Sequence, residues 1–295
     1  SLGLGVLQVN AGLAFIAGVP QSPGIQIALI AGITLLATLS VYMGLDKGVK
    51  RLSEFNIILA AILLGFVLLT GSTIFLLQAF VQNTGAYFGQ VVERTFRLYA
   101  YEPNEWLSNW TLFYWGWWIA WSPFVGMFIA RVSRGRTVRE FIICVLLLPS
   151  LVCALWMSVF GGMALEQLAA GYEGAKDVVV AYRPELSFFR MIDQFPFYSI
   201  VAPISLVLIV VFFVTSSDSG SLVIDTITAG GKVDAPVPQR VFWCVFEGAV
   251  AIVLLLSAGG LASLQSMVIS TGLPFTVVLL VMCWAIYKGL VDERR

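Results

Sequence analysis

Runs of about 20 apolar residues recur along this chain, and they constrain its fold more than any other feature. A helical segment of this length crosses the hydrocarbon core of a bilayer, where every backbone polar group must be satisfied within the structure. Only 12% of the residues are charged, whereas soluble domains carry about 25%. The sequence therefore predicts an all-α, polytopic membrane protein with roughly seven full spans.

We expect one transmembrane domain over residues 1–295. Its membrane helices are predicted at about 1–18, 25–44, 54–80, 107–130, 139–161, 198–229, 239–258 and 262–288. The segments 81–105 and 164–197 are too polar to be spans, and we interpret both as external amphipathic segments. Because the chain starts in an apolar run without an initiator methionine, we interpret the first segment as a partial helix of an N-terminally truncated chain.

Lysine and arginine are distributed unequally between the two alternating sets of connections. One set holds 12 of them, namely Lys47, Lys50, Arg51, Arg131, Arg134, Arg136, Arg139, Lys232, Arg240, Lys288, Arg294 and Arg295. The other set holds 5, namely Arg94, Arg97, Lys176, Arg183 and Arg190. The positive-inside rule then predicts that the loops 46–53, 131–139 and 230–240 and the C-terminus are cytoplasmic.

Several functional classes are disfavoured by composition. Histidine is absent, which excludes histidine-based triads, metal sites and proton relays. The four cysteines lie in apolar stretches without metal-ligand spacing, so no metal site and no cofactor is expected. No basic patch with exposed aromatics indicates nucleic acid. An intramembrane aspartyl protease needs two carboxylates that meet across helices, whereas Asp218 and Asp225 lie about two turns apart on one predicted helix. We therefore do not expect an enzyme.

Residues 110–128 contain nine aromatic residues, five of them tryptophan. At about 100° per residue, one arc of a helix would hold Trp110, Phe113, Tyr114, Trp117, Trp121, Phe124 and Phe128. Trp118 borders this arc and Trp115 faces away from it. A wall of indole rings suits a cation without hydrogen-bond donors, such as a quaternary ammonium. The alternative is ordinary helix packing, to which aromatic rings also contribute large contact areas.

Pro123 and Gly126 favour the binding interpretation of this aromatic segment. Proline removes the hydrogen bond to the carbonyl of Ile119, and glycine permits a close approach of another helix. An irregular point beside an aromatic wall is typical of a binding site at the middle of the membrane.

A second candidate lies at residues 212–221, Phe-Phe-Val-Thr-Ser-Ser-Asp-Ser-Gly-Ser. Hydroxyls within a span can ligate a hard cation together with carbonyls freed at a helix distortion. The alternative is interhelical hydrogen bonding, which is common for serine and threonine in membranes. Asp218 is a functional candidate because it is an acid within a span, although pairing with an arginine or helix capping would also explain it. For Asp225, nearer the interface, we favour such a structural role.

The loop 131–139 contains four arginines and is interpreted first as a topology signal, with contact to anionic lipid as the alternative. Thr137 with Glu140 three residues later predicts a capping box at the start of the next helix.

The chain resembles the betaine/choline/carnitine transporter (BCCT) family. The resemblance is carried by the segment from Trp110 to Thr137, with its Trp-Gly-Trp-Trp-Ile-Ala-Trp-Ser-Pro-Phe motif, and by the segment from Phe213 to Ser221. It implies the C-terminal two-thirds of a twelve-helix carrier with a core of two inverted five-helix repeats. The aromatic segment would be the eighth helix and the hydroxyl segment the tenth.

The resemblance also implies site residues. Trp117, Trp118 and Trp121 match the tryptophans that contact substrate, and Phe113 of the same arc is added as a candidate. Thr215 and Ser216, with the carbonyl of Phe212, match ligands of a sodium site, and Phe124 matches a residue beside a second proposed cation site. Gly116 replaces an alanine found in many relatives. The first four helices, which complete both sites in the family, are absent from the sequence.

The function implied is sodium-coupled import of a quaternary ammonium solute, such as glycine betaine, choline or carnitine, by alternating access. Its partners would be the substrate, sodium, membrane lipid and, as a homotrimer, two further copies, in a bacterial inner membrane. Alternatives are a proton-coupled choline carrier and, less favoured, a sodium-independent exchanger, because such exchangers replace the Trp-Ser-Pro-Phe stretch. A structural scaffold is the expectation if the aromatic wall faces lipid.

Overall fold

The computed structural model describes residues 2–43, 48–232, 235–257 and 260–293, and no strand occurs among them. The longer helices are α1 (Leu2–Ala17), α2 (Pro23–Met43), α3 (Lys50–Thr70), α4 (Thr73–Phe96), α5 (Phe113–Val132), α11 (Tyr198–Thr228), α12 (Val237–Leu256) and α13 (Leu261–Asp292). A π-helical turn, η2 (Leu107–Leu112), precedes α5. The predicted all-α fold is confirmed.

Shorter elements form the segment between α5 and α11. An arm consists of α6 (Val138–Ile142), α7 (Leu148–Trp156) and α8 (Gly162–Ala169), joined by the π-helical turns η3 (Ile143–Leu147) and η4 (Met157–Gly161). It is followed by α9 (Glu173–Val180), the 3-10 turn η5 (Pro184–Leu186) and α10 (Ser187–Ile192). The predicted capping box starts the arm, because Thr137 Oγ1 accepts from the Glu140 amide at 3.3 Å and Glu140 Oε2 accepts from the Thr137 amide at 2.9 Å.

Six helices of the described chain are long and apolar enough to cross a membrane, against the roughly seven predicted. They are Pro23–Met43, Lys50–Thr70, Val138–Ala169, Tyr198–Thr228, Val237–Leu256 and Ala262–Asp292. The aromatic helix α5 has 20 residues but is not among them. Its tryptophan and tyrosine rings each carry a polar group, which lowers the hydropathy of a segment that is long enough to span.

The predicted helix over 54–80 is wrong as a single element. α3 ends at Thr70, and α4 begins at Thr73 and continues to Phe96, through most of the segment 81–105. Gly71 has extended backbone, and its amide caps α3 by donating to the carbonyl of Val67 at 3.0 Å. A glycine followed by a serine can leave the helix at little cost. The predicted apolar run over 54–80 is therefore divided between α3 and α4 by a bend at Gly71.

Two clusters of buried side chains hold the helices together, and α11 contributes to both. One joins α1, α2, α11 and α12, with Val6, Ile33, Ala37, Val214 and Leu255 among its members. The other joins α3, α4, η4, α10 and α11, with Val67, Leu76, Val159, Ile192 and Leu208 among its members. The segment 164–197 thus packs part of its apolar surface on the helices.

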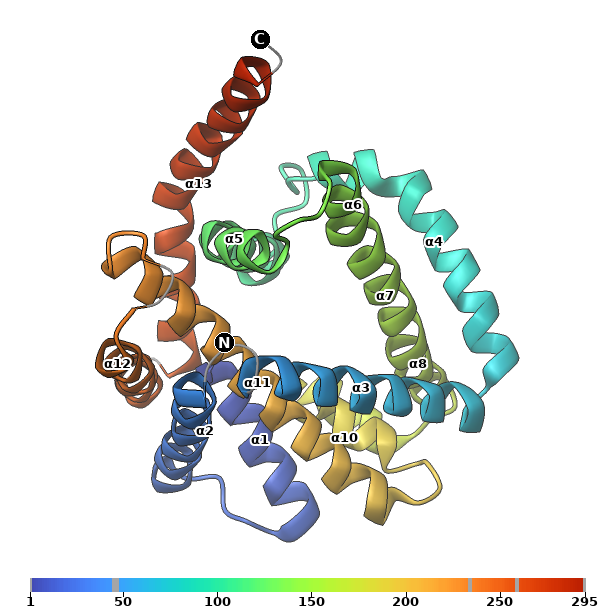
Figure 1. Ribbon diagram of the computed structural model, residues 1–295. Helices are drawn as coiled ribbons and strands as arrows, with labels where there is room; N and C mark the ends of the chain where they lie inside the picture. Colours follow the sequence, from blue (N-terminus) through green and yellow to red (C-terminus); the bar gives the residue numbers. More distant parts are fainter. Residues whose placement is uncertain (1, 44–47, 233–234, 258–259, 294–295) are drawn as a thin grey trace.

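Helix α5 packs most extensively on α13 and lies between α13 and the arm, with α4 on the outer side of the arm (Figure 1). The helices α5 and α13 approach each other closely at two glycines, because a Cβ built on Gly272 would lie 2.9 Å from Gly116 Cα. Small residues allow such contacts between membrane helices. A Cβ on Gly116 itself would be 3.4 Å from Ile269 Cα, so an alanine would fit at this position.

Candidate functional site

Helix α5 remains continuous through Pro123 because a neighbouring side chain replaces the missing hydrogen bond. Proline cannot donate to the carbonyl of Ile119, and Ser122 Oγ donates to that carbonyl instead, at 2.8 Å. The carbonyl that proline leaves without its backbone donor, as predicted from the sequence, is therefore satisfied within the helix. The Trp-Ser-Pro-Phe stretch keeps Trp121 and Phe124 one turn apart, with ring centroids at 6.3 Å in an edge-to-face arrangement.

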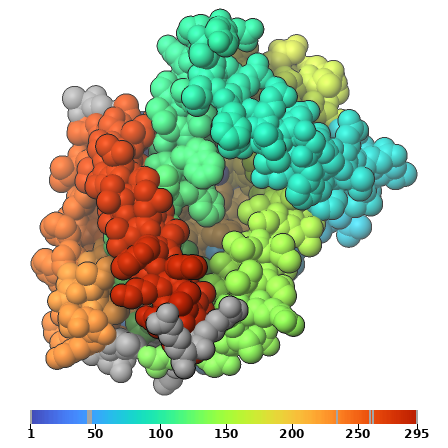
Figure 2. Space-filling view, turned by 90° about the horizontal axis from the view of Figure 1, so that it is seen from above, coloured from blue at the N-terminus to red at the C-terminus, as the bar shows by residue number. Residues whose placement is uncertain are grey.

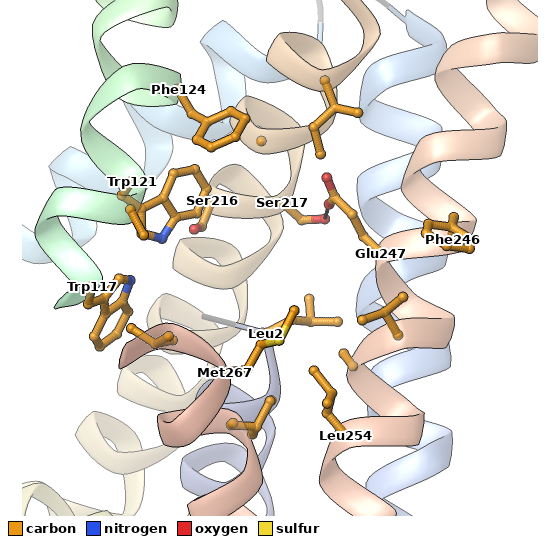
Figure 3. A pocket seen from close by; sticks show the side chains of 18 of the residues that line it. Leu2, Trp117, Trp121, Phe124, Ser216, Ser217, Phe246, Glu247, Leu254 and Met267 are labelled. Atoms are coloured by element: carbon orange, nitrogen blue, oxygen red, sulfur yellow. Dashed lines mark hydrogen bonds between the residues drawn. The ribbon is translucent and has the colours of Figure 1, made fainter. Parts of the chain in front are cut away.

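A cavity of about 450 Å³ lies between α5, α11, α12, α13 and the start of α1, and we call it the central cavity. Figure 3 shows Trp117 and Trp121 of α5 on one side of it and Glu247 of α12 on the other, with Ser216 and Ser217 of α11 between them. Most of the remaining lining is apolar or aromatic. The central cavity therefore combines π faces with a small number of oxygen atoms.

A second cavity, here called the lateral cavity, lies between α5, α11 and the start of the arm and has a volume of about 780 Å³. It is lined by Tyr114, Trp117, Trp118, Trp121, Ser122, Phe124, Val125, Gly126, Phe128, Ile129, Phe141, Val145, Ser216 and Ser219. In the space-filling view the surface is hollowed between α5 and the yellow-green segment that follows it (Figure 2). The two cavities thus share the wall formed by α5.

The predicted aromatic residues do not all lie at these cavities. Trp117, Trp121 and Phe124 line both, whereas Trp118 lines the lateral cavity and is 71% exposed. Phe113 lines neither of the two; it is buried, and its ring packs on Trp117 with centroids 5.5 Å apart. Trp115, predicted to face away, also lines neither cavity.

The hydroxyl residues of α11 are placed differently from one another. Thr215 Oγ1 donates to the carbonyls of Val211 at 3.1 Å and Phe212 at 3.0 Å. Ser216 lines both cavities, and its hydroxyl has no hydrogen-bond partner among the described residues. The helix distortion considered for a cation site is absent, because α11 is one α-helix from Tyr198 to Thr228, so the Phe212 carbonyl is not freed by a break.

Three acidic residues of α11 and α12 each have different partners. Asp225 forms an ion pair with Arg240, at 3.8 Å, in line with the structural role expected for it. Asp218 is fully buried and accepts a hydrogen bond from Ser40 of α2, at 2.5 Å, in place of the arginine pairing or capping considered for it. Glu247 accepts from Ser217 at 3.2 Å and from Ser221 at 3.1 Å.

Glu247 is not among the site residues predicted from the sequence. The available signal was a single acid inside the predicted span 239–258, which is a functional candidate in any membrane helix. The structure identifies its neighbours, which belong to α11 and to the aromatic wall of α5.

These features define a polytopic helical membrane protein with an aromatic cavity between its helices. The profile of the BCCT, betaine/carnitine/choline family transporter, matches residues 1–295, and the chain belongs to this family.

The names of similar curated proteins agree with this family assignment. The chain is 56% identical over 296 residues to a glycine betaine/proline/choline transporter of Vibrio parahaemolyticus, covering 100% of the chain and 52% of that protein. It is 48% identical over 298 residues to a glycine betaine transporter of Acinetobacter baylyi, covering 100% of the chain and 44% of that protein. It is 42% identical to the glycine betaine transporter OpuD of Bacillus subtilis, covering 100% of the chain and 57% of that protein. The chain spans about half the length of these relatives.

Proposed function

We propose that this chain carries part of the substrate pathway of a secondary transporter that imports a quaternary ammonium solute by alternating access. The observation that carries the proposal is the shared wall of the two cavities. Trp117 and Trp121 present their rings there, and the Ser216 hydroxyl lies across from them on α11. A methylated ammonium offers no hydrogen-bond donor, so indole faces are a suitable partner for its charge.

The proposed substrates are of the glycine betaine, choline or carnitine type, in keeping with the description of the family and the names of the relatives. The contact residues proposed are Trp117, Trp118 and Trp121. Phe113 is proposed as a support for Trp117, on which its ring packs. The activity is transport and not catalysis, and the proposed architecture is the twelve-helix carrier with two inverted repeats, assembled as a homotrimer.

Sodium is the proposed coupling ion. Thr215, Ser216 and the Phe212 carbonyl would contribute oxygen ligands, and Phe124 would lie beside a second cation site. The hydrogen bonds that Thr215 donates leave the lone pairs of its oxygen available to a cation. A hard cation needs about six oxygen ligands, so other parts of the intact transporter would complete the shell.

The test is uptake of labelled choline and glycine betaine by proteoliposomes that contain the intact transporter. Uptake is measured with an inward sodium gradient, with an inward proton gradient and with neither. We expect accumulation with the sodium gradient. Accumulation with the proton gradient alone would show that the coupling ion is the proton and not sodium. Failure to take up either solute under all three conditions would refute the proposed function.

We further propose an orientation in a bacterial inner membrane, with residues 46–53, 131–139 and 230–240 and the C-terminus in the cytoplasm. In a cysteine-free background, Val180→Cys should react with an impermeant thiol reagent on intact cells and Ser133→Cys should not. The reverse labelling would invert the orientation. Val180 is suitable because it is 86% exposed.

A further inference from the structure

We propose that Glu247 is the counter-charge for the substrate ammonium in the central cavity, and that it selects choline-type cations over zwitterionic betaines. The inference rests on the proposed function, because it assigns a polar partner to the same cavity. It concerns α12, which carried no candidate site in the sequence analysis.

Glu247 and Trp121 lie on opposite sides of the same small space above Gly220. A Cβ built on Gly220 would lie 3.3 Å from Trp121 Cη2, 3.5 Å from Glu247 Oε1 and 3.9 Å from Glu247 Oε2. Glycine at position 220 therefore leaves a gap that is bordered by an indole ring and by a carboxylate. A methyl group of a bound ammonium that enters this gap would contact a π face on one side and a negative charge on the other.

The carboxylate of Glu247 is held in place by donors from α11. Ser217 and Ser221 are four residues apart, so they lie on one face of α11, and both donate to Oε2. The Cys244 thiol donates to Ser221 Oγ at 3.1 Å, so the Ser221 proton is available to Glu247. A chain of donors that ends on one carboxylate oxygen stabilises its negative charge. The other oxygen, Oε1, is the one nearer the gap.

The surroundings of Glu247 suit an organic cation better than a sodium ion. A hard cation needs about six oxygen ligands. The described residues lining the central cavity offer side-chain oxygens from Ser216, Ser217 and Glu247, and most of the other lining residues are aromatic or aliphatic. Trp117, Trp121 and Phe124 can contact methyl groups and positive charge together, which a quaternary ammonium requires.

The negative charge has a consequence for selectivity. Choline carries one positive charge, whereas glycine betaine carries a carboxylate a few bonds from its ammonium. Placed beside Glu247, the betaine carboxylate is repelled by a charge of the same sign, which offsets part of the attraction for the ammonium. Removal of the Glu247 charge should therefore weaken choline binding more than betaine binding.

The experiment measures equilibrium binding of three ligands to the purified intact transporter, wild type and Glu247→Gln. The ligands are choline, glycine betaine and 3,3-dimethylbutan-1-ol, in which carbon replaces the nitrogen of choline. We expect Glu247→Gln to weaken choline binding roughly tenfold or more, glycine betaine binding less, and the neutral alcohol least. Glu247→Asp keeps the charge and should retain the order of the three ligands found in the wild type.

Glu166→Gln is the matched control, because Glu166 also accepts a hydrogen bond from a serine, Ser72 at 2.7 Å, but does not line the central cavity. It should leave all three affinities unchanged. Equal losses for all three ligands in Glu247→Gln, with Glu247→Asp behaving in the same way, would show a structural role and overturn the inference. An altered sodium dependence with unchanged selectivity would also overturn it. Wild-type protein that binds no quaternary ammonium would instead refute the proposed function, and the inference with it.

Discussion

The two sides of α11 use serine and threonine in different ways. On the side of the lateral cavity, Thr215 and Ser219 donate to carbonyls of their own helix, at Val211, Phe212 and Thr215. On the side of α12, Ser217 and Ser221 donate across the helix contact to Glu247. Both patterns satisfy a hydroxyl inside a span, but they leave different groups available to a ligand.

In both patterns the hydroxyl donates its single proton and keeps lone pairs on its oxygen. The acceptor differs: it is a neutral backbone carbonyl on the first side and a carboxylate, which carries the charge, on the second. One side of α11 is therefore suited to ligate an ion with neutral oxygens, and the other to hold an acid against a cavity. Trp121 of α5 lines both cavities and faces both sides.

The largest effect is expected at Trp121, because it serves both sides. Trp121→Leu in the intact transporter should weaken choline binding roughly thirtyfold, the equivalent of about 2 kcal/mol for a desolvated cation-π contact. Trp115→Leu is the control, since it removes the same groups from the same helix at a residue that lines neither cavity. Comparable losses in both variants would indicate that the tryptophans contribute packing alone.

A smaller effect is expected at Gly220, between Trp121 and Glu247. Gly220→Ala should reduce choline binding about tenfold, because the added methyl group occupies the gap that a ligand methyl group would fill. Alanine is the better helix former, so a weaker helix would not explain the loss. The control is Gly126→Ala on α5, where a Cβ meets no atom within 4 Å. Undiminished binding in Gly220→Ala would mean that this gap holds no part of the ligand.

The smallest effect tests the other side of α11. Thr215→Ala and Ser216→Ala should each raise the sodium concentration for half-maximal uptake about fivefold, since each removes one oxygen worth about 1 kcal/mol. Thr226→Ala is matched to Thr215→Ala, because Thr226 Oγ1 likewise donates to the carbonyl four residues earlier, at 2.8 Å. If the sodium dependence of both variants equals that of Thr226→Ala, these hydroxyls have only a structural role.

Local signals in the sequence predicted part of this arrangement. The 3.6-residue period was sufficient to group Trp117, Trp121 and Phe124, and Thr137 with Glu140 specified a capping box. The lengths of the apolar runs predicted most of the helices but not the bend at Gly71. The hydrophobicity of a run does not indicate where the chain leaves one helix and starts the next.

The contacts between helices could not be predicted in this way. Ser217 and Ser221 precede Glu247 by 30 and 26 residues, and their bond depends on how α11 packs on α12. Phe113 lines neither of the two cavities, and this too depends on how the neighbouring helices pack and not on the period of α5. The distortion considered for a cation site at residues 212–221 is absent. The hydroxyls of this segment find acceptors without opening the helix, apart from Ser216, which lines the cavities.

The central claim is that the wall shared by the two cavities recognises positive charge and not merely apolar shape. The direct measurement is the binding of choline and of its neutral isostere 3,3-dimethylbutan-1-ol to the intact wild-type transporter. We expect choline to bind at least roughly thirtyfold more tightly than the alcohol, as one desolvated cation-π contact provides. Equal affinity for the two ligands would contradict it, even if the tryptophans were essential for transport.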